Sequence, residues 1–153
     1  MIEPLARFLG LFCGGLAAGI ALCVLLMGRL SSGRGQFYTE LMQVLIRTLT
    51  VPAPALGALS MTAIAIDSVL LFRRGAGAAF GLTVGSLLCG LSALALTKLG
   101  HFPLNDQILK WNPANLPPDW ARIQARWSAL HVGRTIAALA SFGLFLLSSS
   151  LLR

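Results

Sequence analysis

The chain has 153 residues, of which 56% are hydrophobic and only 11% are charged, and its formal net charge is +7. A soluble domain of this length rarely reaches a mean hydropathy of +0.79, so the composition favours a lipid bilayer over water as the solvent. Most basic residues lie between long apolar runs instead of forming one polar patch, which argues against a nucleic-acid partner and for contact with lipid headgroups.

Four apolar stretches are long enough to cross about 30 Å of hydrocarbon as helices of about 20 residues. They cover residues 5–27, 54–72, 77–99 and 131–152. Their continuous apolar character lacks the alternation of barrel strands. The sequence therefore predicts an all-α, integral membrane four-helix bundle, with residues 1–153 forming one domain. We expect a multi-pass protein of the bacterial cytoplasmic membrane whose first span is retained as an anchor.

Small residues are prominent in the first and third spans. The first span carries Gly10, Gly14, Gly15 and Gly19. The third carries a row at four-residue spacing, made of Gly77, Gly81, Gly85, Cys89 and Ala93. Such rows let membrane helices approach closely, and they would also permit a homo-oligomer. The cysteines, Cys13, Cys23 and Cys89, lie inside apolar runs, and we expect them to be small buried hydrophobic side chains.

A polar turn at residues 31–35 follows the first span and leads into an amphipathic segment. Its apolar residues recur at helical spacing, and they are Tyr38, Leu41, Met42, Leu45 and Leu49. This pattern predicts an interfacial helix between the first two spans, placed like a lid on the bundle. Pro52 and Pro54 end this helix and suit the first turn of the second span.

The second and third spans are joined by the very short segment Arg73, Arg74 and Gly75, which makes the two helices antiparallel neighbours. Asp67 lies inside the second span near this turn. We expect it to pair with Arg74, Arg7 or Arg153, in preference to a role in proton relay.

Residues 100–118 are rich in proline and asparagine, which is typical of a long structured loop. Trp111 in this loop and Trp120 after it indicate an interfacial aromatic belt. Asp119 is expected to cap a helix that runs into the fourth span and is longer than the membrane is thick. More cations flank the two longer loops than the opposite face, but this count alone does not fix the orientation of the protein.

Polar residues at membrane depth are expensive and often functional, which draws attention to His131 and Arg134. With Trp127 they share one face of the fourth helix. Three further polar residues lie in the loop at the same end, and they are His101, Asn105 and Asp106. Such a group suits proton abstraction from a flat, weakly acidic organic molecule: a histidine takes the proton, a guanidinium stabilises the anion and an indole stacks on the rings.

A purely structural reading stays open beside the chemical one. In it Arg134 reaches lipid phosphates, Trp127 belongs to the aromatic belt, and His131 bonds a loop carbonyl. Only two histidines exist, thirty residues apart, with Asp106 as a possible third ligand, and no metal-binding motif is present. We therefore expect no metal site.

Two short motifs resemble the anthrone oxygenase-like membrane proteins. The first is Pro103-Leu104-Asn105 after the third span, and the second places Trp127, Leu130, His131 and Arg134 at the start of the fourth. Many members of this family are known only as a domain of unknown function. In its named members an anthrone is oxidised by molecular oxygen to an anthraquinone without a metal or flavin cofactor.

The resemblance implies candidate positions for the same chemistry here. His131, Arg134 and Asn105 are the expected catalytic residues, and the motif does not fix which of them is the base. Trp127 is the substrate contact that the motif implies. His101, Asp106, Trp111 and Tyr38 are not motif positions, and we expect them to contact the substrate from their places in the sequence alone. The first hypothesis is an oxygenase, without a cofactor and with oxygen as co-substrate, that acts on a hydrophobic, aromatic, polyketide-like molecule. The second is a non-catalytic membrane protein that binds or helps to transport a small molecule, or is a subunit of a larger complex.

Overall fold

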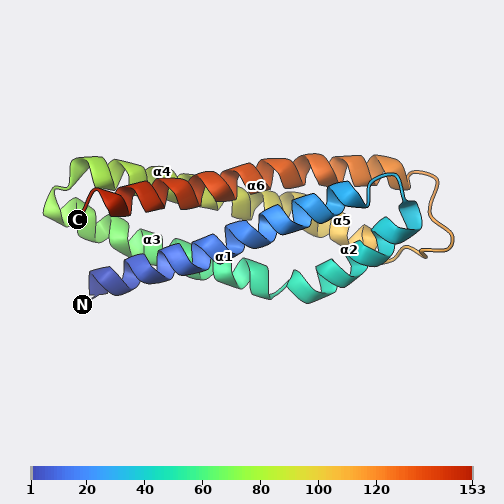
Figure 1. Cartoon of the computed structure of the whole chain (residues 1–153), viewed down its shortest axis with the longest axis horizontal. Coiled ribbons are helices and arrows are strands. Elements are labelled where there is room, and N and C mark those ends of the chain that lie inside the picture. The colour runs from blue at the N-terminus through green and yellow to red at the C-terminus, as the bar shows by residue number, and fades with distance from the viewer. Residues whose placement is uncertain (1, 153) are drawn as a thin grey trace.

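In the computed structural model, which describes residues 2–152, the chain is built from helices (Figure 1). In chain order these are α1 (Ile2–Leu30), α2 (Gly35–Leu49), α3 (Pro52–Arg74), α4 (Gly77–Ala95), the π-helix η1 (Leu96–His101), α5 (Phe102–Ile108) and α6 (Trp120–Ser150). Within residues 2–152 there is no β-strand, only one isolated bridge between Asn112 and Asn115. The predicted all-α class is confirmed.

Four helical segments are long and apolar enough to cross a membrane: α1, α3, the continuous run from Gly77 to Ile108, and α6. Each contains one of the expected spans, except that α6 ends at Ser150, two residues short of the fourth. Helix α1 packs on α3 and α6, and α4 packs on the same two helices, which closes a four-helix bundle. Large apolar side chains such as Phe8 and Ile136 are exposed on its outer surface. This is the layout of a multi-pass membrane protein whose outer surface contacts lipid.

The turn between α3 and α4 is set by Gly75, which has φ of +68°. A left-handed residue at this position ends a helix, and glycine adopts it without a steric penalty. The Gly75 N–H donates to the carbonyls of Leu71 and Phe72. The predicted antiparallel pairing of these two helices is confirmed by their contact.

The close packing expected of the glycines is present at some positions of α1 and α4 and not at others. A Cβ at Gly10 would lie 2.5 Å from a ring carbon of Phe145, and one at Gly14 would lie 2.8 Å from the Ser60 hydroxyl. At Gly77 and Gly81, by contrast, a Cβ would meet no atom within 4 Å among the described residues. In α4 the close approach occurs instead at Gly90, outside the predicted row, where a Cβ would meet the Met61 side chain of α3.

The expected burial of the cysteines is confirmed for Cys13 only. Cys89 is half-buried and Cys23 is exposed. The expectation was wrong for Cys23 because an apolar run does not tell which residues of a membrane helix face its neighbours and which face outward.

Helix α2 lies with α5 at the end of the bundle away from the two termini (Figure 1). It buries Tyr38, Met42 and Ile46, so the predicted amphipathic helix is present. Gln43 joins α2 to the end of α5 and to the segment after it, because its Nε2 donates to the Ile108 carbonyl at 3.0 Å and to the Trp111 carbonyl at 2.9 Å. The interfacial position of α2 stays a prediction.

The first half of the expected loop between the third and fourth spans is helical. The chain continues from α4 through η1 and α5 to Ile108, so the loop prediction was wrong for residues 100–108. Pro103 lacks an N–H and crowds the preceding turn, and a π-helical turn absorbs this disturbance without ending the helix. His101 and Asn105 consequently lie in a continuous helical segment and not in a loop. Asp119 does occupy the N-cap position of α6, but its carboxylate accepts from Arg122 and not from the helix backbone.

At the end of the bundle that carries the termini, acidic and basic side chains neutralise one another. The Nε of Arg7 donates to Asp67 Oδ1 at 3.1 Å, and Glu3 pairs with both Arg7 and Arg74. The expected pairing of Asp67 with Arg7 is therefore present. Arg153, the third partner considered for it, lies outside the described residues.

Candidate functional site

Three aromatic and imidazole rings meet at the end of the bundle near α2 and α5. Trp127 and His131 lie one turn apart on α6, and their rings stack with centroids 4.6 Å apart and planes at 9°. His101 meets both rings edge-on from η1, at 5.2 Å from Trp127 and 5.5 Å from His131. All three side chains are buried. The shared face of the fourth helix thus points into the bundle and receives His101 from the third membrane-crossing segment.

Both ring nitrogens of His131 are engaged by protein atoms. Nε2 lies 2.9 Å from the Ala21 carbonyl, and Nδ1 lies 3.0 Å from a terminal nitrogen of Arg134. A carbonyl oxygen only accepts and a guanidinium only donates. Nε2 therefore carries the hydrogen and donates it to Ala21, while Nδ1 accepts from Arg134. This assigns the neutral imidazole to His131 and makes it a link between α1 and the guanidinium.

His101 has one engaged nitrogen and one free one. Its Nδ1 lies 3.2 Å from the Leu96 carbonyl, five residues earlier, so Nδ1 carries the hydrogen. Its Nε2 is buried and has no hydrogen-bond partner among residues 2–152. The imidazole is 1% exposed. The free Nε2 therefore presents a lone pair, able to accept a proton, in a place that water does not freely reach.

Within the described part of the chain, no acidic side chain pairs with the positive charge of Arg134. Within residues 2–152 no carboxylate lies within 4.0 Å of its guanidinium. One terminal nitrogen donates to His131, but Nε is buried and has no partner in the same part of the chain. A cation in apolar surroundings is costly unless an anion or acceptor compensates it. Arg134 is thus a donor suited to an oxygen that is, or becomes, negative.

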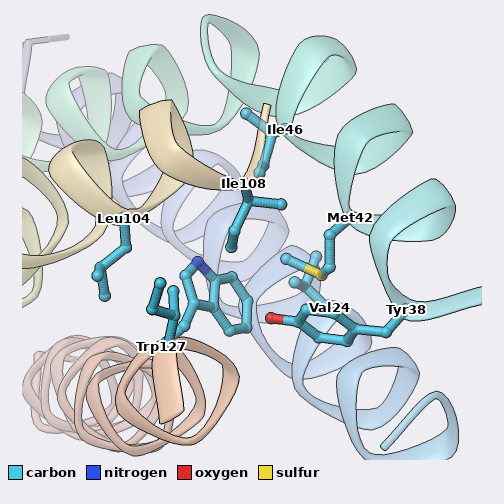
Figure 2. Packing of buried hydrophobic residues seen from close by; sticks show 8 residues of the cluster. Val24, Tyr38, Met42, Ile46, Leu104, Ile108 and Trp127 are labelled. Carbon is cyan, nitrogen blue, oxygen red and sulfur yellow. The ribbon is translucent and has the colours of Figure 1, made fainter. Parts of the chain in front are cut away.

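Asn105 fixes the indole of Trp127. Its side-chain oxygen accepts from Trp127 Nε1 at 2.9 Å, which joins α5 to α6. The indole belongs to an apolar cluster that includes Tyr38, Met42 and Ile108 (Figure 2). Asn105 therefore acts on the ring stack through Trp127.

Two neighbouring cavities meet at Arg134. The first, of about 60 Å³, lies under α2, and its polar lining comes chiefly from His101, Asn105, Trp127 and Arg134. The second, of about 100 Å³, lies inside the bundle between α1, α3, α4 and α6, and its walls are mostly glycine, alanine and other apolar residues. Arg134 lines both cavities, whereas His131 lines neither. His101 and Arg134, each with a buried nitrogen that has no partner within residues 2–152, thus share the wall of the first cavity.

The remaining residues expected at the site, Tyr38, Trp111 and Asp106, line neither cavity. Tyr38 packs beside Trp127, and in Figure 2 its hydroxyl points toward the indole. That hydroxyl has no partner within residues 2–152, and burial raises the pKa of Tyr38 above its usual range. Trp111 is half-buried against the same cluster, and Asp106 is exposed.

Some contributors to the site left no mark in the sequence. The Ala21 carbonyl orients His131, and it is a backbone atom whose residue type carries no signal. The wall from α3 is made by Ala53 and Pro54, which looked only like the start of a span. Across residues 2–152, no three His, Cys, Asp or Glu side chains are grouped so that they could hold a metal ion.

One comparison with known proteins finds a match. The family model described as Anthrone oxygenase matches residues 41–144, which run from α2 into α6. This range includes the three residues whose rings meet, His101, Trp127 and His131. No curated protein and no solved structure matches the chain.

Proposed function

This chain belongs to the anthrone oxygenase family, and we propose that it is a cofactor-independent membrane oxygenase acting on an aromatic, polyketide-like substrate of the anthrone type. The observation that supports this most is Arg134, whose guanidinium has no carboxylate partner in the described chain and lines an apolar cavity with a free Nε. An anion that forms only during the reaction would compensate this charge.

An anthrone has a methylene group that is acidic for a carbon acid. Loss of one of its protons delocalises the charge onto the carbonyl oxygen across the ring and makes the central ring aromatic. A guanidinium that donates to this oxygen stabilises the anion more than the neutral ketone, which is the requirement for catalysis. Removal of one such donor typically lowers kcat by about 100- to 1,000-fold.

The resulting carbanion is electron-rich enough to react with oxygen directly. One electron passes to O₂, the two radicals combine to form a C–O bond, and protonation gives a hydroperoxide. Removal of the remaining C–H proton then breaks the O–O bond, releases hydroxide and leaves a carbonyl group. The net change converts one CH₂ and one O₂ into one C=O and one H₂O, with no other oxidant.

The walls of the two cavities suit a flat apolar molecule. The first cavity offers Trp127 and apolar residues of α2, and the second offers the small side chains between α1 and α3. Both are smaller than the roughly 300–1,000 Å³ of typical ligand pockets. We therefore expect the cavity under α2 to widen when a fused-ring substrate enters, by an outward movement of α2.

The test is quinone formation in membranes that contain the protein. Membranes are supplied with an anthrone under oxygen, and the rate is compared with that of membranes carrying equal amounts of the Arg134→Met variant. We expect the wild-type rate to exceed the variant rate by about 100-fold or more once spontaneous oxidation is subtracted. Equal rates in well-folded wild-type and variant protein would remove the support for an oxygenase.

A further inference from the structure

We infer that His101 takes the proton from the substrate, and that His131 is a positioning residue that holds Arg134 in place. This inference rests on the proposed function, since it names the acid–base group of the same site. The sequence motif contains His131 and not His101, whereas the inference assigns the base to His101.

His131 has no free position at which to accept a proton. Its Nε2–H donates to the Ala21 carbonyl at 2.9 Å, and its Nδ1 lone pair accepts from Arg134 at 3.0 Å. Protonation at Nδ1 would replace this hydrogen bond with two facing cations. His131 also lines neither cavity, so a substrate placed there would not reach it.

His101 meets the requirements of a general base that His131 lacks. Its Nδ1–H is fixed by the Leu96 carbonyl, which orients the ring and leaves Nε2 with its lone pair. Within the described chain no group bonds Nε2, and the ring lines the cavity under α2 together with Arg134. A free acceptor and a free donor on one cavity wall can act on two parts of the same ring system: His101 on the C–H, Arg134 on the oxygen.

His101 alone can then carry the proton transfers to and from the substrate. His101 Nε2 removes a methylene proton, and the carbanion formed reacts with O₂. The imidazolium returns that proton to the peroxide anion, which restores the neutral base. His101 then removes the remaining C–H proton as the O–O bond breaks and hydroxide leaves, and the hydroxide takes this proton to form water.

Replacing each histidine by asparagine separates the two roles, because the nitrogen or the oxygen of the asparagine side chain can take the place of the histidine Nδ1. In His101→Asn the amide N–H can still donate to Leu96, but the basic Nε2 is lost. In His131→Asn the amide oxygen can still accept from Arg134, and the remaining imidazole atoms are lost. We expect His101→Asn to lower kcat by at least about 100-fold, and His131→Asn to lower it by less than about 10-fold.

The opposite order, with His131→Asn inactive and His101→Asn active, would overturn the inference. A second pair of measurements guards against an effect on folding alone. Imidazole added to His101→Ala should restore part of the rate, whereas pyrrole, a ring of the same size without a basic nitrogen, should not. Equal effects of imidazole and pyrrole would mean that His101 only fills space.

Binding of 2-hydroxyanthraquinone tests the inference even if no anthrone is oxidised. The hydroxyl of this quinone changes colour when it ionises, and the molecule has no methylene group to react. We expect the ionised spectrum on wild-type protein and on His131→Asn, and the neutral spectrum on His101→Asn. An ionised spectrum that survives in His101→Asn contradicts the inference, whereas failure of the proposed oxygenase would appear only as absent turnover.

Discussion

The hydrogen bond between Trp127 and Asn105 gives a quantitative prediction about the ring stack. The indole N–H donates to the Asn105 side-chain oxygen at 2.9 Å, and Trp127 is 4% exposed. In Asn105→Leu a buried donor loses its acceptor, and such a loss costs about 1–3 kcal/mol. For a chain of this length each kcal/mol corresponds to roughly 2–4 °C in Tm. We therefore expect Asn105→Leu to lower Tm by about 2–12 °C.

The double variant isolates the hydrogen bond from other effects. Trp127→Phe removes the donor as well as part of the ring area, so alone it is destabilising through both losses. When Asn105→Leu is added to it, no indole N–H remains to be left unpaired. The two changes should therefore be less than additive, with an interaction energy of about 0.5–3 kcal/mol.

Thermal unfolding in detergent provides the assay. Cys13 is buried, so a dye that fluoresces on reaction with a thiol reports unfolding in a background of Cys23→Ser and Cys89→Ser. The wild-type, the two single variants and the double variant are measured in that background. Additivity of the two changes within about 0.5 kcal/mol would refute the assignment of this hydrogen bond.

Two further predictions concern the rest of the bundle. Gly10→Ala should destabilise the protein by about 1–3 kcal/mol, because the new methyl group meets the buried ring of Phe145. Gly19→Ala on the same helix is the control and should be neutral, because no described atom lies within 4 Å of the new methyl group. Equal Tm values for the two variants would contradict the packing of α1. Arg7→Met should destabilise the protein by about 3–5 kcal/mol, because it leaves the buried Asp67 without the partner that lies 3.1 Å away. The same change at the exposed Arg73 is the control, and we expect it to leave Tm unchanged.

Much of the architecture was accessible from the sequence. The four spans, the short turn at Gly75 and the amphipathic helix follow from apolar runs, from the brevity of one connection and from helical spacing. These signals are local, and the low dielectric of a membrane makes helices the natural outcome for such runs. The helix through Pro103 was missed because proline normally ends a helix, and only the packing of the whole segment permits a π-helical turn there.

The site was predictable in its residue types but not in its division of roles. Spacing on one helix placed Trp127, His131 and Arg134 on one face, and the structure shows this face together with His101. No sequence pattern could show that the Ala21 carbonyl takes one nitrogen of His131, or that the free nitrogen belongs to His101. The first feature depends on a contact between residues 110 positions apart, and the second on which atoms surround His101 in the folded chain.

The central claim is that the charge of Arg134 promotes oxygenation of an aromatic carbon acid, and oxygen isotope labelling tests it most directly. Membranes containing the wild-type protein or Arg134→Met are given an anthrone under ¹⁸O₂, and labelled quinone is followed over time. The account predicts one ¹⁸O atom per quinone, at the former methylene carbon, formed much faster by the wild-type. Wild-type quinone whose new oxygen comes from water, or labelled quinone formed at the same rate by both proteins, would contradict it.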